Sequence, residues 1–355
     1  MDSLRLTDRI VQCFHGVGLG GSQPQLYNLA LLCRALAFSR DCHLANLALE
    51  LPLVERRASL EQRLQRLLDN ARFDVRRCYA PLGRQILRQW RGTEICLVMD
   101  RTDIQADVSV LLLGIAYHKR LLPLTWRVLR FGATGSDDQL PLLEQVHRWL
   151  PPAVRVAFHA DSEFRKLDVQ RWCQRQDWHW QVGLHNTLLY RTTAGAGQPL
   201  QGLAMQCGQR RYLQHVWLGA QGFGPVNLIA DWPVKQAGPH YWAIDLPANP
   251  QAWRRGRKRY WIESTFRDWK SAGFDLEASH IRTPDRLEHL LLGMALTNVW
   301  LMHIGEWLVR SGRSRDLARR STDYSLFRLG RDYLERTRTL PGPIPVGLTL
   351  AGWAS

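Results

Sequence analysis

Three charged residues late in the sequence have a spacing that could serve metal-dependent chemistry on DNA. On a helix over residues 257–272, Arg259, Glu263 and Lys270 fall within about 40° of one another. Glu263 could bind a metal ion there while the two cations contact phosphates. The neighbouring stripe consists of Ile262, Phe266 and Trp269. This apolar stripe predicts that the helix packs on a sheet. The alternative is an Arg–Glu pair on a solvated helix, worth about 0.2–0.5 kcal/mol.

Two aspartates follow strand patterns and could complete such a site. The apolar run Ile95–Met99 ends in Asp100, and an alternating run over 154–158 closely precedes Asp161. Strand ends can bring carboxylates that are remote in sequence to one edge of a sheet. Three carboxylates suit two hard divalent cations, which serve phosphoryl transfer. Each aspartate alone could equally be a turn or cap residue. The competing carboxylates are Asp103, Asp107, Glu163, Asp168, Asp231 and Asp245. We expect Glu163 to point away from the site.

In these three segments the sequence resembles the DDE transposases of bacterial insertion sequences, in the group called insertion-sequence family four. There a Thr usually stands two residues after the first acid, as in Asp100-Arg101-Thr102. The second acid has a context like Asp161-Ser162-Glu163-Phe164. The third lies in the signature Y-x2-R-x3-E-x6-K, to which this chain supplies Arg259, Glu263 and Lys270. The chain has only five lysines, so a lysine at the signature position is informative.

The resemblance implies both a fold and a reaction. The fold would be an RNase H-like core with a β insertion before the last catalytic helix. Asp100, Asp161 and Glu263 would be the catalytic residues and would hold two Mg²⁺ or Mn²⁺ ions. The enzyme would cut the ends of a mobile element, through a hairpin in much of this group, and transfer the freed strands to target DNA by cut-and-paste. Arg259 and Lys270 would hold phosphates near the cut.

A run of cations beside Glu263 strengthens the expectation of DNA binding. The run consists of Arg254, Arg255, Arg257, Lys258 and Arg259. Cations are unfavourable near the start of a helix, so stability alone does not account for them. A solvated helix start is the alternative. The signature Tyr would fall at Gly256, and the nearest aromatics, Trp253 and Tyr260, are out of register.

The surrounding patterns predict the elements that carry these residues. We expect an α/β protein with an RNase H-like mixed sheet flanked by helices. Helical periodicity predicts a helical N-terminal region, which is also basic and which we expect to bind the DNA ends, and glycine-rich strand patterns predict a β-rich insertion. The expected parts are a helical region 1–90, a first core part 91–185, the β insertion 186–249, a last core part 250–310 with the Glu263 helix, and a basic C-terminal tail 311–355.

Composition supports a nucleic-acid partner. The chain has 355 residues, of which 47 are Lys or Arg and 32 are Asp or Glu, giving a net charge of +15. Hydrophobic residues make up 45%, which excludes a disordered or fibrous protein. An excess charge of this size indicates a polyanionic partner. We expect double-stranded DNA, as element inverted repeats and target, bound by a homodimer, and no membrane.

Seven dispersed cysteines predict reduced thiols, and acids at Asp2 and Asp8 argue against a secretory signal. The longest apolar stretch, Leu290–Met302, contains Thr297 and Asn298 and predicts a core helix. We therefore expect a bacterial cytoplasmic protein that joins the nucleoid when bound to DNA.

Two other functions remain open from the sequence. Another RNase H-like DNA nuclease or resolvase could use the same three acids. A catalytically silent DNA-binding protein derived from a transposase would be expected to lack one acid, and all three are present.

Overall fold

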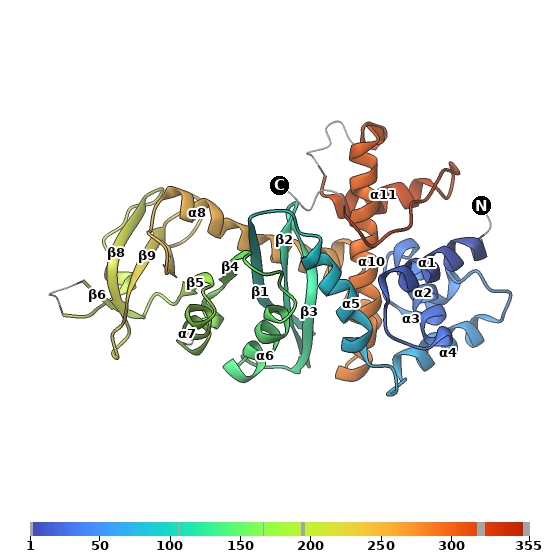
Figure 1. Ribbon diagram of the computed structural model, residues 1–355, viewed down its shortest axis with the longest axis horizontal. Helices are drawn as coiled ribbons and strands as arrows, with labels where there is room; N and C mark the ends of the chain where they lie inside the picture. The colour runs from blue at the N-terminus through green and yellow to red at the C-terminus, as the bar shows by residue number, and fades with distance from the viewer. Residues whose placement is uncertain (1–2, 106, 166, 193–195, 318–323, 351–355) are drawn as a thin grey trace.

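The computed structural model describes residues 3–105, 107–165, 167–192, 196–317 and 324–350. Its centre is a sheet of ten strands in the order β3-β2-β1-β4-β5-β10-β9-β8-β6-β7. The sheet forms the middle and one end of an elongated molecule, and the N-terminal helices form the other end (Figure 1).

Five strands form the first half of this sheet. They are β1 (Glu94–Ile104), β2 (Val108–Tyr117), β3 (Arg120–Arg130), β4 (Arg155–Ala160) and β5 (His179–Leu184). β1, β4 and β5 are parallel, while β2 runs antiparallel to both β1 and β3. Every residue of β2 is buried, as its continuous apolar sequence requires. This mixed sheet, flanked by helices, confirms the predicted α/β fold class.

The remaining strands extend the same sheet. They are β6 (Leu189–Arg191), β7 (Gln198–Pro199), β8 (Arg210–Leu218), β9 (Phe223–Asp231) and β10 (His240–Ile244). β10 pairs antiparallel with β5, from Tyr241 opposite Leu184 to Ile244 opposite Gln181. The β-rich segment is therefore continuous with the first five strands through backbone hydrogen bonds.

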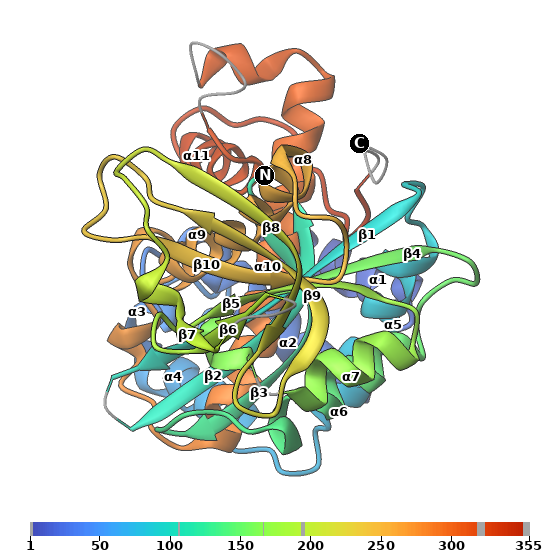
Figure 2. The same cartoon turned by 90° about the vertical axis from the view of Figure 1, so that its left-hand side faces the viewer.

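Helices cover both faces of the core strands. α6 (Ser136–His147) and α7 (Leu167–Arg175) lie on one side of the sheet, and α8 (Pro250–Gly256) lies on the other (Figures 1 and 2). α9 (Trp261–Arg267) follows α8 and packs against β1, β2 and β3. Successive residues of a strand point to opposite faces of the sheet. Neighbouring residues of β1 therefore face different helices.

The predicted helix over 257–272 is continuous in the chain but changes its hydrogen-bonding pattern. A 3-10 turn (Arg257–Tyr260) leads into α9, and a π-helical turn (Asp268–Ala272) follows it. At the start of the π turn, the buried Asp268 accepts hydrogen bonds from Arg120 of β3. The wider turn thus coincides with a buried ion pair, which 3.6-residue periodicity could not reveal.

Five helices precede the sheet and pack around one long helix. They are α1 (Ser3–Val17), α2 (Gln23–Phe38), α3 (Leu44–Leu49), α4 (Arg57–Leu68) and α5 (Val75–Arg88). The long helix, α10 (Pro284–Arg310), contacts α2 on one side and β3 on the other. At Gly293 the α10 backbone approaches Leu32 so closely that an added Cβ would lie 2.7 Å from the leucine Cδ2.

α10 is long and apolar enough to cross a membrane, but most of its apolar window is buried inside the protein. It is the core helix predicted from Leu290–Met302.

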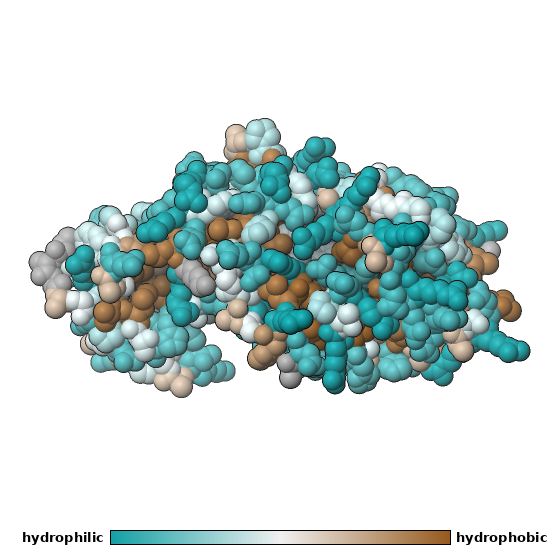
Figure 3. Space-filling view, turned by 90° about the horizontal axis from the view of Figure 1, so that it is seen from below, coloured by the Kyte–Doolittle hydropathy of each residue, from teal (hydrophilic) through white to brown (hydrophobic). Residues whose placement is uncertain are grey.

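The face of the molecule seen from below is mainly hydrophilic, with apolar residues in separate groups (Figure 3).

The residues expected to form a basic C-terminal tail are packed where the structure describes them. α11 (Leu326–Arg336) lies against α10 and buries Phe327, Leu329 and Leu334. Ile344, Leu348 and Leu350 are also buried. The segment predicted as a basic tail therefore contains a helix packed on α10. The prediction relied on the net charge of the segment, which does not show that α11 has an apolar face. Residues 318–323 and 351–355 lie outside the described residues.

Candidate active site

Asp100 lies on the face of β1 that α9 covers. It is 8% exposed, and its Oδ1 accepts a hydrogen bond of 2.8 Å from the backbone nitrogen of Arg101. Burial, followed by the charge of Asp161, raises the pKa of Asp100 to about 7. The prediction that Asp100 ends its strand was wrong, since β1 continues to Ile104 by pairing with β2. Asp100 is instead the first residue beyond the pairing of β1 with β4.

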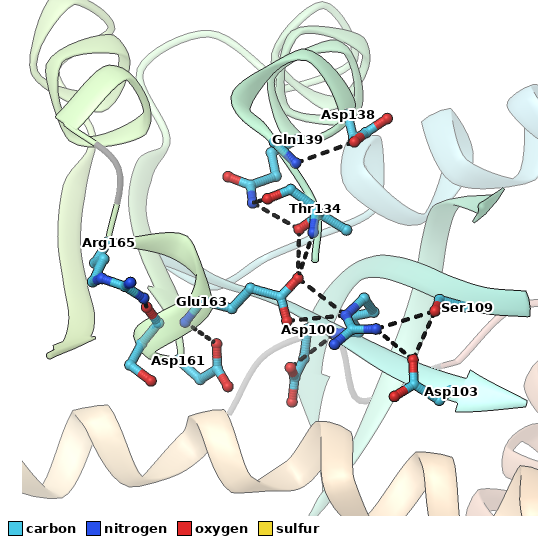
Figure 4. A network of polar contacts seen from close by, with 12 residues as sticks. Asp100, Asp103, Ser109, Thr134, Asp138, Gln139, Asp161, Glu163 and Arg165 are labelled. Atoms are coloured by element: carbon cyan, nitrogen blue, oxygen red, sulfur yellow. Dashed lines mark hydrogen bonds and ion pairs between the residues drawn. The ribbon is translucent and has the colours of Figure 1, made fainter. Parts of the chain in front are cut away.

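Asp161 follows β4 directly and caps a short 3-10 turn. Its Oδ1 accepts a hydrogen bond of 2.8 Å from the backbone nitrogen of Glu163. A glycine in the next strand allows this turn to approach the sheet, since a Cβ at Gly183 would lie 2.7 Å from the nitrogen of Ser162. Asp100 and Asp161 both point toward the helix that runs below them (Figure 4).

Arg259 connects two of the three predicted carboxylates. Its Nη1 lies 3.4 Å from Oδ2 of Asp100, and its Nη2 lies 2.6 Å from Oε1 of Glu263. The Arg259 side chain is 13% exposed, whereas that of Glu263 is 52% exposed. The i,i+4 pair weighed as an alternative is therefore present, and it also reaches β1.

Among the described residues, no three His, Cys, Asp or Glu side chains stand close enough together to form a metal-binding group. The guanidinium of Arg259 explains this, because it occupies the space between Asp100 and Glu263. The structure thus brings the predicted carboxylates to one region around a cation, without gathering them as a ligand set.

Lys270 lies near the same strand but contacts other groups. Its Nζ donates a hydrogen bond of 2.7 Å to the carbonyl oxygen of Asp103, and it lies 3.2 Å from Oε1 of Glu277. Lys270 therefore forms an ion pair with Glu277, an acid in the segment that follows its own turn. The ammonium of Lys270 thus lies beside the C-terminal end of β1, at Asp103, which is three residues beyond Asp100.

The predicted basic run covers the same face of the sheet. Arg254 and Arg257 are exposed, while Arg255 and Lys258 are half-buried. Arg255 lies 3.9 Å from Glu94, and the guanidinium of Arg257 lies over the ring of Trp253. Burial, and then the charges of Lys258, Arg255 and Arg259, lower the pKa of His159 on β4 to about 3. Part of this shift therefore reflects the positive charge of the run, which reaches β4 two residues before Asp161.

The structure gives a physical reason for glycine at the signature Tyr position. A Cβ at Gly256 would collide with the side-chain amide of Gln181, which is 4% exposed on β5. A tyrosine at this position could not fit without displacing Gln181.

Sequence reasoning dismissed one acid that lies at the centre of a network beside the site. The Glu163 carboxylate binds Arg101, the residue after Asp100, and Thr134, so it lies beside the predicted acids rather than far from them (Figure 4). The signal available in the sequence was its place two residues after Asp161, together with Arg101 directly after Asp100.

The sequence matches the family model described as a transposase DDE domain over residues 95–300, which is more than half of the chain. The chain belongs to this family. The match spans the segments of the transposase that carry Asp100, Asp161, Glu263 and Lys270.

Two further comparisons complete the description of the transposase. No curated protein matches it significantly. A cryo-EM structure of a piggyBac transposase synaptic complex with hairpin DNA is similar, with a TM-score of 0.47 and 12% identity. The similarity covers 96% of this chain and 80% of that chain.

Proposed function

We propose that this transposase moves a bacterial insertion sequence of insertion-sequence family four by cut-and-paste, cleaving the element ends and transferring them to target DNA. The observation that carries the proposal is the shared contact of Arg259 with Asp100 and Glu263, with Asp161 close enough to raise the pKa of Asp100. The predicted cytoplasmic, nucleoid-associated location follows from this function.

The donor set fits divalent cations. Asp100, Asp161 and Glu263 offer carboxylate oxygens, which are the ligands that Mg²⁺ and Mn²⁺ prefer. Burial raises the pKa of Asp100, and the charges of Asp161 and Glu263 add to the shift while Arg259 opposes it, so additional positive charge would favour the ionised carboxylate. Two bound cations would supply that charge and the activation of oxygen needed for phosphoryl transfer.

Arg259 would have to leave its two carboxylates for such cations to bind. A DNA phosphate near the cut offers a guanidinium a strong bidentate partner. Lys270, whose ammonium lies beside the end of β1, would bind a neighbouring phosphate. Arg254, Arg255, Arg257 and Lys258 would hold the DNA backbone, and each phosphate contact would add about one unit to the slope of log affinity against log salt.

The N-terminal helices would recognise the element ends. Residues 1–90 contain thirteen arginines and eight acids, and a groove between α2 and α4 presents amides beside guanidinium groups. The groove is lined in part by Gln25, Asn28, Gln62, Arg63, Arg66 and Asn70. Amides and guanidinium groups are the side chains that read base edges. Two similar ends call for two copies of the protein, hence a homodimer.

The test is cleavage of a supercoiled plasmid that carries the inverted repeats flanking the gene. We expect nicking and strand transfer with Mg²⁺ or Mn²⁺, and none with EDTA. Asp100→Ala, Asp161→Ala and Glu263→Ala should each abolish cleavage while largely sparing DNA binding. Asp332→Ala, on α11, is the control and should cut normally, because Asp332 pairs with Arg328 and not with a residue of the site.

The same assay separates the alternatives. Cleavage of unrelated DNA as fast as of the element ends would indicate another RNase H-like nuclease. Specific binding without cleavage under any divalent cation would indicate a silent DNA-binding protein. Cleavage by all three alanine variants at the parent rate would refute the proposed active site.

A further inference from the structure

We propose that Arg101 and Glu163 are positioning residues that fix the separation of the Asp100 and Asp161 carboxylates. This inference rests on the proposed function, because it concerns the same two acids. It assigns a role to two side chains outside the three predicted acids. In the described part of the chain, neither side chain contacts Glu263 or the basic run.

The two aspartates lie just where backbone pairing between their strands stops. β1 and β4 pair in parallel register from Glu94 opposite Arg155 to Met99 opposite Ala160. Asp100 and Asp161 are the next residue on each strand. The sheet therefore aligns the strands up to the site, and side chains must hold them together beyond it.

The Arg101–Glu163 ion pair spans this gap. Nε of Arg101 lies 3.0 Å from Oε1 and 2.9 Å from Oε2 of Glu163. The side chains are 18% and 19% exposed, so water screens this pair less than a surface pair. The pair joins the residue after Asp100 to the turn that begins at Asp161.

Each member of the pair also holds its neighbouring aspartate through the backbone. The nitrogen of Arg101 donates to Oδ1 of Asp100 at 2.8 Å. The nitrogen of Glu163 donates to Oδ1 of Asp161, also at 2.8 Å. Because the backbone nitrogen of each paired residue holds one carboxylate, a change in the ion pair that moves either backbone segment also moves its carboxylate.

Neutral and charged partners anchor both ends of the pair (Figure 4). Nη1 of Arg101 donates to Oγ of Ser109 at 3.1 Å and binds Asp103. Oε1 of Glu163 accepts from the nitrogen and the hydroxyl of Thr134, at 2.9 and 2.7 Å. The Thr134 hydroxyl in turn accepts a bond of 2.8 Å from Gln139 of α6. The pair is thus tied to β2 and to the loop before α6.

The experiment measures Mn²⁺ binding by electron paramagnetic resonance in complexes with pre-cut end DNA, alongside cleavage of uncut ends. Glu163→Gln keeps the shape of the side chain and removes its charge. We expect Mn²⁺ affinity to fall about 10-fold or more, as is usual when a residue that supports metal ligands is changed. Cleavage should fall in parallel, and end binding should not change.

The matched control is a pair with the same geometry on α11 that contacts none of the three acids in the described residues. Nε of Arg328 lies 2.9 and 2.8 Å from the two oxygens of Asp332. Asp332→Asn should leave Mn²⁺ affinity and cleavage unchanged. Thr134→Val removes the hydroxyl that donates a hydrogen bond to Glu163. It is the milder variant to use if Glu163→Gln lowers the melting temperature substantially, and it should also weaken Mn²⁺ binding.

A double-mutant cycle tests whether the two residues act through one another. Arg101→Gln and Glu163→Gln together should lower Mn²⁺ affinity no more than the worse single change, and Arg101→Lys should retain part of it. Unchanged affinity in Glu163→Gln and Thr134→Val, or additive losses in the cycle, would overturn the inference. If Asp100→Ala abolishes cleavage in that case, the proposed function stands and only this inference fails.

Discussion

The buried carboxylate of Asp100 should lower the stability of the folded protein at neutral and alkaline pH. Burial and the charge of Asp161 raise its pKa from 3.8 to about 7, and Arg259 only partly opposes this. A raised pKa means that the folded protein prefers the protonated acid. The Asp100→Asn variant replaces that acid by a neutral side chain of the same shape. We therefore predict that Asp100→Asn is more stable than the parent protein at pH 8 in the absence of metal.

The magnitude follows from the shift. One pKa unit corresponds to about 1.36 kcal/mol, so a shift of about three units costs at most about 4 kcal/mol of unfolding free energy. The cost is absent below about pH 4, accumulates as the pH rises, and is complete above about pH 7. At about 2.1 cal/mol/K per residue, unfolding 355 residues gives a rise in melting temperature of about 5 °C.

The assay is thermal unfolding of the parent and Asp100→Asn in EDTA at several values between pH 4 and pH 8. The difference in melting temperature should be largest at pH 8 and should vanish near pH 4. Asp332→Asn, which breaks a surface pair, should change stability by less than about 1 kcal/mol at pH 8. A difference that does not depend on pH, or an Asp100→Asn variant less stable at pH 8, would refute the reasoning.

Substitutions at three further positions test separate parts of the protein. Lys270→Ala should reduce cleavage substantially without changing the metal concentration required, and Lys270→Arg should retain part of the activity. Cleavage by Lys270→Ala at the parent rate across a salt titration would show that Lys270 serves only to pair with Glu277. Arg66→Ala should lower the ratio of end-specific to random DNA binding, measured by competition, while an unchanged ratio would place recognition elsewhere. Gly256→Ala should lower unfolding free energy by about 1–3 kcal/mol by displacing Gln181, and unchanged denaturant unfolding would contradict the close approach.

Local patterns in the sequence predicted most strands, because apolar runs and alternation are local properties. The alternating run over 154–158, for example, was predicted as a strand and largely coincides with β4. The end of β1 could not be predicted, since residues 101–104 are polar or mixed and stay extended through pairing with β2. Whether the insertion extends the central sheet also depends on a long-range pairing, that of β10 with β5.

The candidate site was predictable in its acids and not in its contacts. Spacing placed Arg259 beside Glu263, but the additional contact of Arg259 with Asp100 joins residues 159 positions apart. Glu163 illustrates the same limit, because its partner Arg101 is 62 positions away. Periodicity assigns a face to a residue, whereas these contacts depend on how β1, β4 and the α9 segment are packed.

The central claim is that Asp100, Asp161 and Glu263 together bind divalent cations when DNA is present. Anomalous scattering from Mn²⁺ in crystals of the protein with pre-cut end DNA tests it most directly. We predict Mn²⁺ peaks at about 2.0–2.6 Å from oxygens of all three carboxylates, with Arg259 moved to a phosphate. A complex in which Mn²⁺ binds away from these acids while Arg259 still bridges Asp100 and Glu263 would contradict the claim.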